Sequence, residues 1–138
     1  MRALVQRVSR ASVATDAGPL ASIGPGLLVL LGVAPHDDEE VAERLADKVR
    51  ALRVFDDSEG RMNEPLGDRE VLCVSQFTLY ADTRKGNRPS FTGAAPADVA
   101  GPLYEHFCER LGAGRGAFGA RMAVELTNDG PVTILIES

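Results

Sequence analysis

Three short segments carry side chains whose types and spacing could do chemistry. The first, residues 75–79 (Ser-Gln-Phe-Thr-Leu), continues an apolar run and places hydroxyl and amide groups inside or beside a predicted core. Buried polar groups need hydrogen-bond partners, and a ligand can supply them. Taken alone, this segment is explained more simply by hydroxyl groups that pair across neighbouring strands.

The second segment, residues 85–91 (Lys-Gly-Asn-Arg-Pro-Ser-Phe), combines two cations, a hydroxyl and an aromatic ring in a loop shaped by glycine and proline. Cations beside an aromatic ring suit a phosphate-bearing ligand with a base that stacks. A solvated loop anchored by its phenylalanine explains the same residues equally well.

The third segment is residues 128–133 (Asn-Asp-Gly-Pro-Val-Thr). Its Asn-Asp-Gly start predicts a β-hairpin, but Pro131 removes a backbone donor at the start of the next strand. A Gly-Pro bond adopts the cis form readily. In that form, carbonyl oxygens around Gly130 would face one side and could hold an ammonium group, although the dipeptide alone favours a plain turn.

Familiar catalytic motifs are missing from the rest of the chain. There is no GxSxG, HExxH, Walker loop or GxGxxG after a strand. His36 and His106 are isolated, and neither is expected to act as a general base. With only Cys73 and Cys108 beside them, no metal site and no cofactor are predicted, and both cysteines are expected to be buried free thiols.

Length and composition predict one ordinary globular domain over residues 1–138, with 44% apolar and 25% charged residues. A net charge of -5 argues against nonspecific coating of nucleic acid, yet permits binding of a nucleic-acid end through a local basic patch. No apolar run approaches the ~20 residues of a spanning helix, and no signal peptide is recognisable. We therefore expect a cytoplasmic protein without a membrane partner.

The elements that must position these segments follow from periodicity. Acidic residues 37–40 predict a helix start, and Val41, Leu45, Val49 and Leu52 continue it at helical spacing. A second helix is predicted over residues 96–111, and residues 55–67 form a loop or hairpin. The predicted strands cover residues 3–15, 20–23, 27–34, 71–80, 120–126 and 132–137. The fold class is therefore α/β or α+β with a large sheet.

In this order, the three segments resemble the D-aminoacyl-tRNA deacylase (D-tyrosyl-tRNA deacylase) family. The resemblance extends to residues 4–8 (Leu-Val-Gln-Arg-Val), to residues 26–33, and to residues 118–122. It implies a homodimer of single α+β domains with a β-barrel-like sheet and two main helices. It also implies hydrolysis of the ester of D-aminoacyl-tRNA to free D-amino acid and tRNA, extending to glycyl-tRNA(Ala), without a cofactor. The implied partner is the aminoacyl-tRNA 3′ end, and not DNA.

The same resemblance implies a role for individual residues. Gly130 and Pro131, joined in cis, would enter the partner subunit's site, present carbonyl oxygens to the substrate's α-ammonium and exclude L side chains. Arg7 would brace them. Water would attack with help from the ribose 2′-hydroxyl. The implied catalytic residues are Gln76, Phe77 and Thr78, with main-chain N–H groups for the oxyanion, and the implied adenosine contacts are Ser90, Phe91, Phe118, Ala120 and Met122.

Two alternatives share this substrate end. One is a related editing module selective for L-aminoacyl esters, and the other is a noncatalytic module that binds the tRNA 3′ end. The chain departs from the family pattern in residues 64–70 and 112–117, which are shorter, and at Arg121, where an acidic residue is more usual. These departures bear on contacts with the tRNA body.

Overall fold

Two long antiparallel strands, β1 (Arg2–Thr15) and β8 (Ala123–Glu137), form the backbone of the sheet in the computed structural model, which describes residues 1–138. The other edge of β1 pairs antiparallel with β3 (Gly26–Gly32) and then with β2 (Gly18–Ile23). β1 is therefore hydrogen-bonded along both edges, and β8 pairs with a strand that is itself held in place by β2 and β3.

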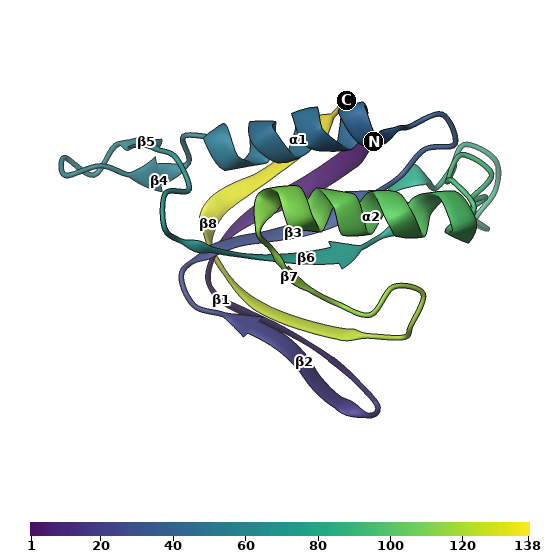
Figure 1. Cartoon of the computed structure of the whole chain (residues 1–138), viewed down its shortest axis with the longest axis horizontal. Coiled ribbons are helices and arrows are strands. Elements are labelled where there is room, and N and C mark those ends of the chain that lie inside the picture. Colours follow the sequence, from purple (N-terminus) through teal and green to yellow (C-terminus); the bar gives the residue numbers. More distant parts are fainter.

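The sheet continues from β3 through parallel pairing to β6 (Glu70–Ser75), and from β6 to β7 (Gly114–Arg115). At the far edge of the sheet, β7 lies close to β2. A Cβ added at Gly114 of β7 would be 3.7 Å from the Cβ of Ala21 in β2. The sheet curls and nearly closes on itself (Figure 1). The predicted α+β class with a barrel-like sheet and two helices is confirmed.

Two helices, α1 (Glu39–Ala51) and α2 (Ala97–Leu111), lie side by side over one face of the sheet (Figure 1). The Asp38 side chain caps α1 by accepting a hydrogen bond of 2.9 Å from the backbone N–H of Val41, as the acidic start predicts. α2 ends at Gly112, whose positive φ of 70° suits glycine. No helix is long and apolar enough to span a bilayer.

A small hairpin, β4 (Phe55–Asp56) with β5 (Met62–Glu64), projects from the end of α1. It lies at the opposite end of the molecule from the loops that connect β6 to α2 (Figure 1). The sequence-based choice of loop or hairpin for this segment is resolved in favour of the hairpin.

The core is divided by the sheet into two clusters. The larger lies between sheet and helices and takes Leu27, Val29 and Leu31 from β3, together with the buried free thiols of Cys73 and Cys108. The smaller lies inside the curled sheet and takes Leu28, Leu72 and Val74, among others. β3 is therefore buried on both faces, as its uninterrupted apolar run predicts.

The strand predicted over residues 71–80 is wrong beyond Ser75. The chain turns at Gln76 and forms a single 3₁₀ turn, η1 (Phe77–Tyr80). The partner strand β3 ends at Gly32, so pairing with β6 has no further support. Leu79 and Tyr80 pack closely over Gly32, where an added Cβ would lie 3.2 Å from each side chain.

The hairpin predicted at residues 128–130 is also wrong. The two predicted strands on either side of it are halves of one strand, β8, and both pair with β1. Gln6 pairs with Thr133 and Val8 with Asn128, so residues 129–132 all stand opposite Arg7. We call residues 128–132 the β8 bulge. β1 is long enough to pair with both halves of β8, so the turn-forming residues make a bulge within one strand and not a hairpin between two.

Candidate active site

A cavity of about 460 Å³ opens between the end of β6, the start of α2 and the segment that leads into β8. Its floor shares Val74, Met122 and Val124 with the small core inside the curled sheet. Ten of its thirteen lining residues are apolar, which suits the flat face of a base. The lining residues are Val33, Val74, Ser75, Gln76, Phe77, Ala95, Ala97, Ala100, Phe118, Gly119, Ala120, Met122 and Val124.

No titratable side chain lines this cavity. His106 lies elsewhere, with its Nε2 2.9 Å from Glu43 Oε1 between the two helices. The Thr78 hydroxyl accepts a hydrogen bond from the Gln76 side-chain amide and has no basic partner. A threonine hydroxyl without a base is a weak nucleophile, so the cavity walls offer no activated side chain for covalent catalysis.

What the cavity edge does offer is a pair of main-chain donors. Phe77 and Thr78 begin η1, where backbone N–H groups have no acceptor within the turn. Gln76 donates to Leu31 at 2.7 Å and Leu79 donates to Gln76 at 3.2 Å, and no hydrogen bond to a loop or turn carbonyl is donated by Phe77 or Thr78. Two adjacent free donors are the geometry that stabilises a developing oxyanion.

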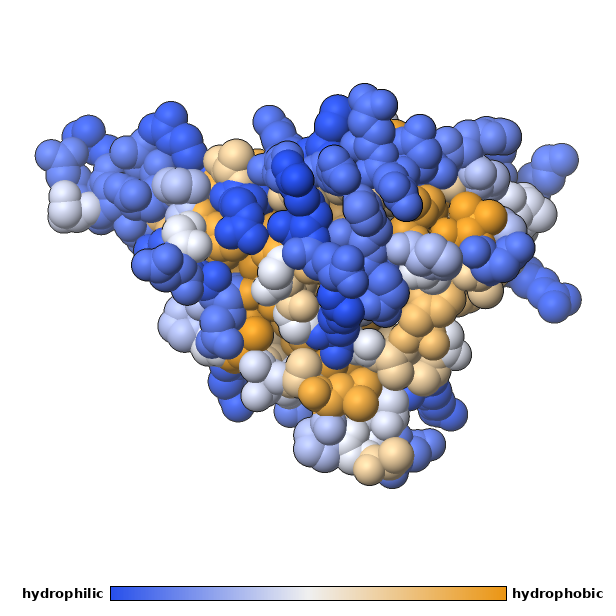
Figure 2. All heavy atoms as spheres, in the orientation of Figure 1, coloured by the Kyte–Doolittle hydropathy of each residue, from blue (hydrophilic) through white to orange (hydrophobic).

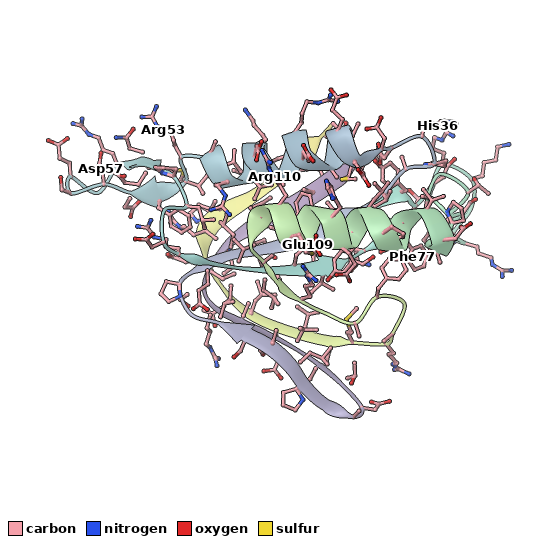
Figure 3. All side chains as sticks on the ribbon, in the orientation of Figure 1. His36, Arg53, Asp57, Phe77, Glu109 and Arg110 are labelled. Atoms are coloured by element: carbon pink, nitrogen blue, oxygen red, sulfur yellow. The ribbon has the colours of Figure 1, made fainter.

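Aromatic rings form the rim and wall. Phe77 is 54% exposed, and its ring meets that of Phe91 edge to face with centroids 5.1 Å apart. Phe118 packs against Tyr104 with centroids 5.9 Å apart. Figure 3 shows Phe77 beside the start of α2, next to the loop that precedes β8. The Tyr104 hydroxyl donates to the carbonyl of Cys73 at 2.8 Å, and burial raises its pKa above the ordinary tyrosine value.

Arg2 holds the far end of η1 and was missed by sequence reasoning. Its Nη1 donates to the Leu79 carbonyl at 2.8 Å, and its guanidinium lies 4.6 Å from the centroid of the Tyr80 ring. Desolvation, and secondarily Asp37, raises the pKa of Tyr80 to about 12. The residue type and the strand position were visible, but the distance from residue 2 to residue 79 in sequence hid the contact.

The β8 bulge is braced by Arg7, the one charged residue in the chain that is buried, at 8% exposed. Its Nε donates to the Asp129 carbonyl at 3.0 Å and its Nη1 to the Val54 carbonyl at 2.7 Å. The Asn128 amide nitrogen donates to the carbonyls of Arg7 at 3.0 Å and Val132 at 3.1 Å. The bulge is therefore a hydrogen-bonded structure and not a loose loop.

Gly130 and Pro131 lie at the exposed tip of the bulge, and the peptide bond between them is cis. A Cβ added at Gly130 would lie 2.5 Å from Asn128 Oδ1. Since two hydrogen bonds hold the Asn128 amide, this contact has little room to relax. The position therefore requires glycine as long as Asn128 keeps its place.

The structure divides the residues singled out in the sequence into two groups. Gln76, Phe77, Phe118, Ala120 and Met122 line one cavity, Thr78 is bonded to Gln76, and Phe91 touches Phe77. Ser90 lines a neighbouring polar hollow. Arg7, Gly130 and Pro131 do not line this cavity. The six steps along the strand from Val124 to Gly130 span about 20 Å.

Comparison with known proteins identifies the family of the chain. The model of the family D-Tyr-tRNA(Tyr) deacylase matches residues 4–137. D-aminoacyl-tRNA deacylase of Roseiflexus castenholzii is 57% identical, covering 100% of this chain and 92% of that protein. The protein of the same name from Deinococcus deserti is 54% identical, covering 99% of each. The chain therefore belongs to the D-Tyr-tRNA(Tyr) deacylase family of enzymes, as its sequence motifs predict.

Two solved structures share the fold. One, "c-Myc DNA Unwinding Element Binding Protein", is 42% identical with a TM-score of 0.93 and covers 100% of this chain and 99% of its own. The other, described as a probable eukaryotic D-amino acid tRNA deacylase, is 16% identical with a TM-score of 0.84, covering 98% of this chain and 97% of its own. At that identity the second likeness concerns the fold alone.

Proposed function

We propose that this protein hydrolyses the ester bond of D-aminoacyl-tRNA, releasing the D-amino acid and tRNA. Family membership supports the activity, and the observation that carries the chemistry is the cavity itself. It is an apolar space of about 460 Å³ with two free main-chain donors at one edge and no titratable side chain. The terminal adenosine occupies the apolar part, with Phe118, Ala120 and Met122 as its wall and Ser90 and Phe91 beyond the rim.

The ester carbonyl then lies over the start of η1. Its oxygen accepts from the N–H groups of Phe77 and Thr78 as negative charge develops, and removal of one such donor typically costs 10²–10³-fold in rate. Gln76 and Thr78 keep the turn in place through their mutual hydrogen bond. Because the walls supply no base, the attacking water is assisted by the 2′-hydroxyl of the substrate's own ribose.

Chiral selection is assigned to the β8 bulge of a second copy. The carbonyl oxygens around Gly130 and Pro131 accept hydrogen bonds from the substrate's α-ammonium, each worth about 1.5–3 kcal/mol. With the amine fixed, a D side chain points into open space and an L side chain meets the Gly-Pro backbone. Glycine has no side chain to exclude, so glycyl-tRNA(Ala) is accepted as well.

Three observations support a homodimer. The tip of the bulge is exposed, and it is about 20 Å along β8 from its own cavity wall. Leu126 and Leu135 of β8 are exposed apolar side chains, at 38% and 52%. A twofold arrangement would bury such a surface and bring each bulge to the partner's cavity. A monomer at micromolar concentration in sedimentation would contradict this assembly.

The deciding experiment compares D-tyrosyl-tRNA, L-tyrosyl-tRNA and glycyl-tRNA(Ala) with purified protein and no added cofactor. We expect release of D-tyrosine and glycine, with the L ester spared. Equal rates on both tyrosyl esters would refute chiral selection. Preference for the L ester would indicate the L-selective editing module, and stoichiometric tRNA binding without release would indicate a noncatalytic module. The net charge of -5 disfavours general DNA binding.

A further inference from the structure

The loop between η1 and α2 is a closed, polar structure, and only Ser90 and Phe91 at its end have been given a role. Asp82 and Ser90 pair through two backbone hydrogen bonds, of 2.7 and 2.9 Å, which join the ends of the loop. Gly86 sits near its tip with a positive φ of 64°. The loop therefore has a defined shape although most of its side chains are exposed.

Two of its three cations are unpaired. Arg84 is neutralised by Asp82, with its Nε and Nη2 2.9 and 2.7 Å from the two carboxylate oxygens. Arg84 also lowers the pKa of Asp82, so this pair stays ionised across the neutral range. Lys85 and Arg88 are exposed and form no ion pair, in a chain where seven arginines do.

These groups surround a hollow of about 500 Å³ without a single apolar lining residue. It is lined by Asp82, Arg84, Lys85, Arg88 and Ser90. The loops between β6 and α2 lie at the right of Figure 1, and at that end of the molecule Figure 2 shows hydrophilic residues beside an apolar patch. A polar hollow with two free cations is suited to phosphate oxygens, and not to a base or an amino acid side chain.

Two consecutive residues link the hollow to the candidate active site. Ser90 lines the hollow, the next residue is Phe91, and the Phe91 ring contacts Phe77 at the rim of the apolar cavity. A strand of RNA whose last base lies in the cavity would therefore pass the hollow with its backbone.

We propose that Lys85 and Arg88 bind the backbone phosphates of the nucleotides just before the terminal adenosine of tRNA. This inference rests on the proposed function, since it assumes that the adenosine occupies the apolar cavity. The Asp82–Arg84 pair shapes the loop, and the two free cations carry the binding. A chain with net charge -5 needs such a local patch to hold a polyanion.

The test is the variant Lys85→Ala/Arg88→Ala, with Arg44→Ala/Arg61→Ala as the matched control. Both change the net charge from -5 to -7, and the control cations lie on α1 and between β4 and β5, away from the loop. Deacylation of D-tyrosyl-tRNA by the loop variant should show a KM raised about tenfold. The slope of log affinity against log salt should fall by about 1.4, for two phosphates of single-stranded RNA.

A phosphate-free ester, 3′-D-tyrosyl-adenosine, separates this effect from general damage. The ratio of kcat/KM for the tRNA ester to that for the adenosine ester should fall about tenfold in the loop variant and stay constant in the control. Lys85→Arg/Arg88→Lys should restore the ratio. An unchanged ratio and salt slope in the loop variant would overturn the phosphate site while leaving the deacylase intact. A wild-type protein inert on both esters would instead refute the proposed function.

Binding gives a readout without turnover. A short RNA that ends in CCA and carries no amino acid should bind the wild type and the control alike, and the loop variant about tenfold more weakly. If inorganic phosphate at the same phosphate concentration displaced the RNA completely, the hollow would be a simple anion site and the proposal would be wrong.

Discussion

The cavity beside η1 and the β8 bulge are built on opposite principles. The cavity has apolar walls, no titratable side chain and, at its edge, the first main-chain N–H groups of η1. The bulge is built around the one buried charged residue of the chain, and its Asp129 and Val132 carbonyls accept hydrogen bonds from Arg7 and Asn128. One region provides space and donors, and the other provides acceptors on a rigid support.

This difference indicates a division of tasks. Hydrolysis needs donors for the oxyanion, whereas recognition of an α-ammonium needs acceptors. A single site holding both free donors and free acceptors at close range would pair them with each other. In the proposed dimer, the two sets lie about 20 Å apart along one chain and meet only across the two copies, which keeps both sets available for substrate.

The largest expected effect comes from removing the brace of the bulge. Arg7→Ala leaves the buried Val54 carbonyl without its donor, at a cost of about 1–3 kcal/mol, and releases the partly exposed Asp129 carbonyl of the bulge. We expect D-tyrosyl-tRNA deacylation to fall more than about 100-fold, and the free energy of unfolding to fall by about 2 kcal/mol. Single-turnover kinetics and urea unfolding measure the two.

The control for this variant is Arg10→Ala on the same strand, whose exposed guanidinium contacts only the Thr127 hydroxyl, at 3.2 Å. It should stay within about twofold of wild type, as surface substitutions generally do. If Arg7→Ala behaved like this control, the bulge would have no part in recognition.

An intermediate effect is expected in the cavity wall. Phe118→Ala removes a ring from the adenosine site, and base stacking on an aromatic side chain is worth about 1–3 kcal/mol. KM should rise about tenfold with kcat retained, because the donors at η1 are untouched. Phe118→Leu, which keeps most of the apolar volume, should recover part of the loss. A fall in kcat at unchanged KM would place Phe118 in the chemical step.

The smallest effect is expected for Thr78→Ala. If the substrate's 2′-hydroxyl assists the water, loss of the Thr78 hydroxyl should leave activity within about threefold, since both main-chain donors remain. Deacylation of a 2′-deoxy terminal adenosine ester provides the converse measurement and should be severely slowed. Complete loss in Thr78→Ala, with folding and tRNA binding intact, would instead identify a threonine nucleophile.

The sequence predicted an element correctly wherever residues close in sequence determine its structure. The acidic cap and four-residue spacing located α1, and the uninterrupted apolar run located β3 as a strand buried on both faces. Motifs 75–79 and 118–122 were placed at one site because the family resemblance linked them, and the cavity brings them together.

The errors occurred where a distant partner decides the structure. The β6 prediction ran on through Tyr80 because the pattern stays strand-like, while the true end is set by Gly32 of β3. Asn-Asp-Gly favours a hairpin locally, but pairing of both flanks with β1 makes it a bulge. Contact of Arg2 with Leu79 was equally invisible, since nothing local to either residue requires it.

The pairing of the first strand with the last has a consequence for how the molecule is made. Residues 129–132 take their shape only when β8 has paired with β1, across almost the full length of the chain. Contacts of such large sequence separation form late and slowly. A growing chain on the ribosome can fold its helices early, but we expect it to gain a functional recognition element only after synthesis of its final strand is complete.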